Sequence, residues 1–146
     1  MFQLILIAWD GSRPAERAFD LAVDLARRYD GEVVAASVAH SPAHAETDAD
    51  RAESVTAARM YLESTFDRVR DRAVRAGVPV EQAIIEGDDP ANDILRFAHE
   101  QAFDVVVVGH HRNRRAGRFL LHGLAERLIA NASVPVLVVA DDRERE

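Results

Sequence analysis

The apolar positions of the chain gather in short runs, of which four stand out at residues 4–9, 33–38, 105–108 and 134–139. Three of these runs are rich in β-branched residues, and apolar positions do not alternate cleanly with polar ones. This pattern is typical of parallel strands whose two faces are both covered by helices. A fifth run, residues 80–85, contains more polar side chains and predicts a strand nearer an edge of the sheet.

Apolar residues recur at three-to-four spacing in the gaps between these runs, which predicts a helix in each gap. Ser12 suits the N-cap of the first helix, and Gly31 and Gly77 suit the ends of the first two. Pro90 stands at the first position of the third helix. The expected helical stripes consist of Ala15, Ala18, Phe19, Ala22, Leu25, Ala26 and Tyr29, then Val55, Leu62, Phe66, Val69 and Ala73, then Ile94, Leu95 and Ala98, and finally Leu124, Leu128 and Ile129.

Strand and helix alternate along the whole chain, without an internal repeat or a linker, and residues 40–50 are expected to form a surface loop. This order predicts one α/β domain over residues 1–146. Its core is expected to be a single doubly wound, five-stranded parallel sheet with helices on both faces, a Rossmann-like fold. Because ligands of such folds bind outside the carboxyl ends of the strands, we expect residues 8–12, 38–40 and 109–112 to meet in one crevice.

The charge balance narrows the range of partners. The net charge of −7 at pH 7 favours solubility and argues against general binding to nucleic acid or to an anionic membrane. The chain contains no cysteine, which excludes disulfides, thiolate catalysis and cysteine-based zinc sites. The apolar start lacks a preceding basic segment and is too short to span a bilayer, so we expect a cytoplasmic protein.

Asp10 ends the first predicted strand, just before the amino terminus of a helix. An acid at this position can accept hydrogen bonds from a ribose hydroxyl or a base amine. It can equally cap the turn that it forms with Gly11 and Ser12. The two roles are compatible, and the sequence leaves both open.

Trp9, the only tryptophan, stands next to Asp10 at the mouth of the expected crevice. Tryptophan side chains are usually largely buried, so one interpretation is ordinary core packing. In a second interpretation the ring stacks on a ligand base, and in a third it fills the base pocket and blocks it. The sequence is compatible with all three.

The stretch from Gly109 to Gly123 is the most informative part of the chain. A glycine that ends a buried strand and another that opens a helix can frame a phosphate cradle of backbone N–H groups. Arginine side chains can also grip a phosphate in place of those amides. The alternative interpretation is a solvated, charged surface loop. The basic residues of this stretch are His110, His111, Arg112, Arg114, Arg115 and Arg118.

Several parts of the chain together resemble the universal stress protein family. Residues 5–12, which end in Asp-Gly-Ser, are similar to the family's opening strand and turn, and residues 86–91 resemble its third strand-to-helix junction. Residues 105–109, 123–126 and 132–139 look like its carboxyl half. The resemblance spans nearly the whole chain in the family's order. It implies the form of the Rossmann-like fold called adenine nucleotide alpha hydrolase-like.

The resemblance also implies a site for an adenine nucleotide such as ATP or AMP. Asp10 and Val38 match positions that resemble the family's adenosine contacts. Ala8 and Trp9 stand beside Asp10 and belong to the same predicted site.

The phosphate side of this implied site departs from the family pattern, which is Gly-x-x-Gly, nine residues, then Gly-Ser or Gly-Thr. Without gaps, Gly109 matches the first glycine and Arg112 replaces the second. His122 then replaces the third glycine, and Gly123 replaces the hydroxyl residue. A one-residue shift restores a glycine at 123 but places Leu124 at the hydroxyl position. Each lost hydrogen bond to a phosphate costs about 1.5–3 kcal/mol, so we expect no tight ATP binding through this cradle.

Catalytic and metal chemistry have less support. The histidines at the expected crevice show no tight ligand spacing, so no metal is expected. No elbow motif surrounds Ser12, and its capping role explains it without a nucleophilic one. Because no base for water and no Mg²⁺-holding hydroxyl can be named, we expect a protein that is not an enzyme, with slow nucleotide hydrolysis as the alternative. The histidines considered are His40, His44, His110, His111 and His122.

The resemblance therefore implies a stress-response protein with weak or altered adenine-nucleotide binding that acts mainly through protein contacts. The alternative is an ATP or AMP sensor whose phosphate site is rebuilt from arginines. The last apolar run, which begins at Val134 and ends at Val139, is an exposed edge unless it is paired. The resemblance implies that two copies of the chain pair there as a homodimer.

Overall fold

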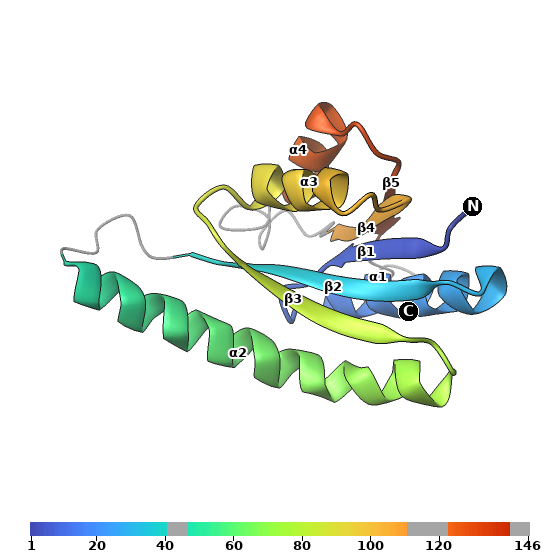
Figure 1. The fold of residues 1–146 in the computed structure, drawn as a ribbon, viewed down its shortest axis with the longest axis horizontal. Coiled ribbons are helices and arrows are strands. Elements are labelled where there is room, and N and C mark those ends of the chain that lie inside the picture. The colour runs from blue at the N-terminus through green and yellow to red at the C-terminus, as the bar shows by residue number, and fades with distance from the viewer. Residues whose placement is uncertain (41–46, 111–122, 141–146) are drawn as a thin grey trace.

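The computed structural model describes residues 1–40, 47–110 and 123–140. These residues form an all-parallel, five-stranded sheet with the order β3-β2-β1-β4-β5 (Figure 1). The strands are β1 (Leu4–Ala8), β2 (Glu32–Ala39), β3 (Val80–Glu86), β4 (Val105–His110) and β5 (Val136–Ala140). The helices between them are α1 (Arg13–Tyr29), α2 (Asp48–Arg75), α3 (Pro90–Glu100) and α4 (Leu124–Asn131). The predicted fold class is confirmed.

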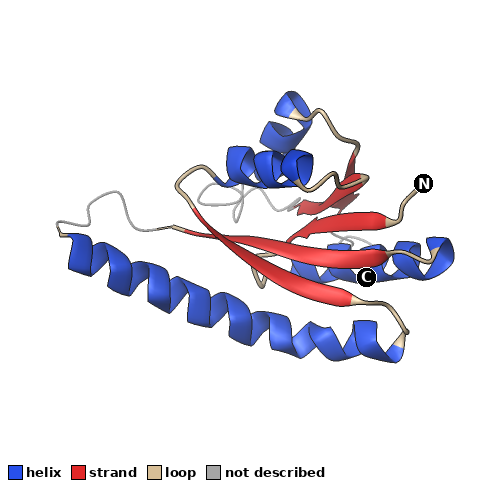
Figure 2. Ribbon diagram, in the orientation of Figure 1, coloured by secondary structure: helices blue, strands red, loops and turns tan. Residues whose placement is uncertain are grey.

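Helices cover both faces of the sheet, with α1 and α2 on one side and α3 and α4 on the other (Figure 2). Successive residues of a strand point to opposite faces, and β1 follows this rule. Ile5 and Ile7 belong to the core under α1 and α2, whereas Leu6 and Ala8 belong to the core under α3 and α4. Burial on both faces explains why the strand sequences are continuously apolar rather than alternating.

The strand order reverses between β1 and β4, because β1 lies next to β2 on one side and next to β4 on the other. The chain winds from β1 through β2 to β3 in one direction and then returns to β4 and β5 in the other. The two edge strands are thus β3 and β5, in line with the polar character of the run at 80–85. The reversal opens a crevice at the carboxyl ends of the central strands.

The first helix begins as predicted but ends slightly differently. The Ser12 hydroxyl accepts a hydrogen bond from the backbone N–H of Ala15 at 3.3 Å, which is an ordinary N-cap. The left-handed residue that ends the helix is Asp30, with φ of 53°, rather than the predicted Gly31. Gly31 is required for a different reason, because a β-carbon there would lie 2.7 Å from the backbone oxygens of Phe2 and Gln3.

Two expectations about the helices are wrong. The helix α2 begins at Asp48, within the loop predicted over residues 40–50, because Thr47 caps it through a 3.0 Å bond from the N–H of Asp50. Acidic residues in that first turn also stabilise the helix through their interaction with the positive end of its dipole. Ile129, predicted on the buried stripe of α4, is 57% exposed, since in this short helix Ala125 and Leu128 supply the buried face.

Candidate functional site

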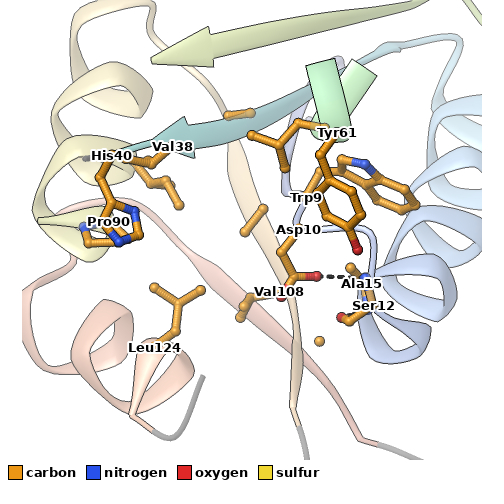
Figure 3. Close-up of a pocket in the computed structure, with 15 residues that line it drawn as sticks. Trp9, Asp10, Ser12, Ala15, Val38, His40, Tyr61, Pro90, Val108 and Leu124 are labelled. Carbon is orange, nitrogen blue, oxygen red and sulfur yellow. Dashed lines mark hydrogen bonds between the residues drawn. The ribbon is translucent and has the colours of Figure 1, made fainter. Parts of the chain in front are cut away.

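A pocket of about 410 Å³ opens at the carboxyl ends of β1, β2 and β4, where the strand order reverses (Figure 3). Its size lies within the range of small-ligand sites, roughly 300–1,000 Å³. Most of its walls are aliphatic. The lining residues are Ala8, Trp9, Asp10, Ser12, Ala15, Ala36, Val38, His40, Tyr61, Leu62, Pro90, Ile94, Val108, Gly109 and Leu124.

Asp10 lies at the wall of this pocket and also holds its own turn. Its Oδ1 accepts a hydrogen bond from the backbone N–H of Ser12 at 2.9 Å, drawn as a dashed line in Figure 3. A carboxylate has about four lone-pair positions, so this bond is compatible with a further bond from a ligand hydroxyl or amine. The capping role is therefore present in the structure, and the pocket keeps the ligand role available.

Trp9 lies in the core, with only 3% of its surface exposed. Its ring meets Phe19 and Phe66 edge-on, with centroid separations of 6.0 Å. The indole Nε1 donates a hydrogen bond to Thr65 Oγ1 at 3.1 Å. Of the three interpretations of Trp9, the structure supports core packing, because the ring is enclosed on the α1–α2 side of the sheet.

The main chain at the end of β1 is tied to β2. The backbone N–H of Trp9 donates to the carbonyl of Ala36 at 2.8 Å, and the Ser37 hydroxyl donates to the carbonyl of Trp9 at 2.7 Å. Val38 lies two residues beyond Ala36 on the same strand and lines the same pocket. These bonds place Asp10 and Val38 on two neighbouring strand ends.

Gly109 lines the pocket at the end of β4, but packing alone requires a glycine there. A β-carbon at this position would lie 2.3 Å from the backbone oxygen of Pro14, at the start of α1. Such an approach is impossible for a side chain, so Gly109 lets α1 pack against β4. The family pattern attributes this glycine to a phosphate, and the structure adds a second cause.

The predicted phosphate side is only partly within the described residues, since Arg112 and His122 lie outside them. Gly123 is the N-cap residue of α4 and adopts φ of 100°, a left-handed conformation that glycine accepts readily. Leu124 follows it and lines the pocket. The amino terminus of α4, whose first backbone N–H groups have no partner within the helix and which carries the positive end of the helix dipole, therefore lies beside the pocket.

Two polar side-chain contacts hold α4 in this place, one of them a hydrogen bond of a histidine and the other an ion pair. His110 Nε2, at the end of β4, lies 2.9 Å from Glu126 Oε1 in the first turn of α4. Arg127 Nη2 lies 2.7 Å from Asp89 Oδ1, the N-cap residue of α3. These contacts fix the amino end of α4 relative to β4 and α3.

The structure brings six residues of the predicted site together at one pocket: Ala8, Trp9, Asp10, Val38, Gly109 and Leu124. Sequence reasoning missed the contribution of α2, which supplies Tyr61 and Leu62. Leu62 was expected on the buried stripe, but Tyr61 stands one residue outside it. An aromatic residue beside a helical stripe was the one available signal.

The charges of the pocket are few. Of the described residues that line it, Asp10 carries the carboxylate and His40 is the basic side chain. The described part of the chain contains no group of three or more His, Asp or Glu side chains able to hold a metal ion. No described helix combines the length and the apolar character that a membrane crossing needs. The arrangement suits a flat, largely apolar ligand that offers a few polar hydrogens to Asp10.

The fold and the pocket define a doubly wound, Rossmann-like α/β protein with a ligand crevice at the reversal of its strand order. Residues 1–140 match the universal stress protein family, and the chain belongs to that family. The resemblance noted from the motifs is thus confirmed.

Relatives agree with this assignment. A universal stress protein of Methanocaldococcus jannaschii is 31% identical over 141 residues, which cover 95% of this chain and 82% of that protein. A crystal structure of a family member from Burkholderia pseudomallei is 29% identical, has a TM-score of 0.77 and covers 94% of this chain and 96% of its own. An Arabidopsis thaliana family member with AMP bound is 20% identical, with a TM-score of 0.67, and covers 98% of this chain and 94% of its own. That last likeness shows the shared fold.

Proposed function

We propose that this chain is a stress-response protein that binds an adenine nucleotide mainly through the nucleoside half of its pocket. It acts through protein contacts as a homodimer rather than by catalysis. The observation that carries the proposal is the pocket itself, which joins Asp10 and Val38 at the strand ends within aliphatic walls.

The residues that line the nucleoside half of the pocket have the chemistry that an adenosine group needs. Aliphatic side chains such as Val38, Val108 and Ile94 offer an apolar slot for a purine ring. Asp10 can accept hydrogen bonds from ribose hydroxyls, which adenosine supplies and a simple apolar ligand does not. The AMP-bound relative from Arabidopsis thaliana supports an adenine nucleotide as the ligand class.

The residues on the phosphate side of the pocket indicate that the phosphates contribute little to the affinity for the nucleotide. No arginine stands among the described lining residues, and Asp10 adds negative charge to the same pocket. Arg112 and His122 replace the family's glycines in the part of the chain that would meet the phosphates. We therefore expect AMP and adenosine to bind with similar affinity, and ATP to gain little from its extra phosphates.

A second candidate is the nucleotide sensor with a phosphate site rebuilt from arginines. The observation that favours it is the amino terminus of α4, which lies beside the pocket and attracts anions. In this case each added phosphate increases the affinity, so that ATP binds far more tightly than adenosine. Comparing the two ligands separates the candidates.

The homodimer part of the proposal rests on β5. This strand pairs with β4 on one side and is the edge of the sheet on the other. Its valine and leucine side chains are only partly buried. Pairing with a second copy would give hydrogen-bond partners to the backbone N–H and C=O groups of this edge and would cover these side chains.

The proposal also places the protein in the cytoplasm, where adenine nucleotides are abundant.

The site is tested by titrating AMP into isotopically labelled protein and following the backbone amide resonances. We expect progressive shifts at Val38, Gly109 and Leu124, which surround the pocket, and none at Val74, which lies on the far end of α2. Shifts confined to other regions, or no shifts at millimolar AMP, would overturn the proposed function.

A further inference from the structure

Tyr61 is a large aromatic side chain that stands exposed at the mouth of the pocket. It lies on α2 and is 60% exposed, although it lines the same pocket as Asp10 and Val38. Figure 3 shows its ring directed toward the turn of Asp10 and Ser12 at the end of β1. A ligand in the pocket would therefore meet this ring.

The turn of α2 that carries Tyr61 is held firmly against the sheet. The next residue, Leu62, is buried, and its carbonyl accepts hydrogen bonds from Thr65 Oγ1 at 2.9 Å and from Gln82 Nε2 at 3.0 Å. Thr65 Oγ1 in turn accepts the 3.1 Å bond from Trp9 Nε1. Because Trp9 directly precedes Asp10, this chain of bonds connects the turn of α2 that carries Tyr61 to the strand end that carries Asp10.

Among the other described lining residues of the pocket, His40 carries the one further exposed aromatic ring. Val38, Ile94 and Leu124 are aliphatic, and the ring of Trp9 is enclosed in the core. Figure 3 shows His40 beside Pro90 and Tyr61 on the side of Asp10, so a planar base that lies next to Asp10 can stack on Tyr61.

We propose that Tyr61 is a positioning residue that stacks on the base of the bound nucleotide and selects for flat aromatic ligands. This inference rests on the proposed function and adds to it a residue on α2, outside the strand-end motifs. Stacking of a base on an aromatic side chain contributes enough that its truncation to alanine weakens binding by about tenfold or more.

The stacking contribution has a specific signature. Because stacking acts on the base, removal of the Tyr61 ring weakens the binding of adenosine and of AMP by the same factor. Tyr61→Phe keeps the ring and is expected to retain binding within about threefold, because removal of an exposed hydroxyl leaves the stacking face unchanged. Met60→Ala is a matched control, since Met60 is the neighbouring residue on α2, is 65% exposed and is not among the residues that line the pocket.

The experiment measures calorimetric dissociation constants for adenosine and AMP with the wild-type chain, Tyr61→Ala, Tyr61→Phe and Met60→Ala. We expect an equal loss of about tenfold or more for both ligands in Tyr61→Ala only. Thermal unfolding of the same variants checks that Tyr61→Ala and Met60→Ala fold alike.

Two results would overturn the stacking role while leaving the proposed function intact. The first is wild-type affinity in Tyr61→Ala. The second is an equal loss in Tyr61→Phe, which would assign the effect to the hydroxyl. Absence of adenosine and AMP binding in the wild-type chain would instead overturn the proposed function itself, and the stacking role with it.

Discussion

The indole Nε1 of Trp9 donates a 3.1 Å hydrogen bond to Thr65 Oγ1, within the buried interface between the end of β1 and α2. This bond joins the strand that carries Asp10 to the helix that carries Tyr61. Both partners are almost fully enclosed, with Trp9 3% and Thr65 5% exposed. The two sides of the ligand pocket are thus connected by one buried polar contact.

Thr65→Val tests this connection. The substitution keeps the shape of the side chain but removes the acceptor, so the indole N–H remains buried without that partner. We expect the free energy of unfolding to fall by about 1–3 kcal/mol, measured by urea denaturation. Thr65→Ser keeps the hydroxyl and should lose less. Equal stability of the valine variant and the wild-type chain would show that the bond contributes nothing.

Gly109→Ala tests whether packing requires this glycine. Its new β-carbon would lie 2.3 Å from the backbone oxygen of Pro14, so α1 must move away from β4. We expect a loss of about 2–3 kcal/mol or more in unfolding free energy. Gly77→Ala is the control, since that residue has φ of 75° but no atom within 4 Å of a new β-carbon. Its loss should be about 1 kcal/mol, and equal losses would contradict the packing requirement.

Arg72 links the two helices on one face of the sheet. Its Nη1 lies 3.1 Å from Asp20 Oδ1 of α1, and its Nη2 also contacts Glu16. Partial burial acts to lower the pKa of the Arg72 guanidinium, but the hydrogen bonds and charges of Glu16 and Asp20 outweigh it and raise the pKa. Since the raised pKa lies above that of the unfolded chain, this contribution is present throughout the neutral pH range.

Arg72→Met should therefore lower the unfolding free energy, by about 1 kcal/mol at most, because all three side chains are more than one-third exposed and solvent screens them. The difference from the wild-type chain should shrink at high salt. Arg28→Met serves as the comparison, since its partner Asp24 is on the same helix and bonds it locally. A loss that does not change with salt would point to packing instead of charge.

The homodimer can be tested at one backbone group of β5. The carbonyl of Pro135 accepts a bond from Val106 of β4, so alternate residues of β5 direct their backbone groups toward β4 and Val138 directs its own toward the open edge. Val138→Pro removes that outward N–H while leaving the β4 ladder in place. We expect a dimer in the wild-type chain and in Val138→Thr at tens of micromolar, and a monomer in Val138→Pro. A wild-type monomer in light scattering would contradict the dimer.

The fold was predictable because the central strands β1, β2 and β4 are largely buried on both faces, which leaves clear apolar runs in the sequence. Motif positions such as Asp10 and Val38 were predictable because topology brings strand ends together. Tyr61 was not, since the approach of α2 to the pocket depends on tertiary bonds such as the one between Trp9 and Thr65. The exposure of Ile129 was not predictable for a similar reason. The spacing of apolar residues along α4 does not reveal how deeply the helix packs on the sheet.

Local and tertiary causes also overlap at single residues. Gly109 matches a phosphate motif in the sequence, yet its contact with Pro14 already requires glycine. Asp10 matches a ligand position, yet it also accepts the N–H of Ser12. A pattern can identify such residues but cannot assign them one role, because the sequence does not reveal which neighbours approach them.

The central claim is that the pocket binds an adenine nucleotide through its nucleoside half, and calorimetric titration of nucleotide-free protein tests it most directly. Adenosine, AMP and ATP should bind with affinities within about tenfold of one another, because the phosphates contribute less than one charged hydrogen bond. Asp10→Ala should weaken the binding of all three ligands by roughly ten- to a hundredfold, and Asp10→Asn should weaken it by less. No binding at millimolar AMP, or unchanged binding in Asp10→Ala, would contradict the account.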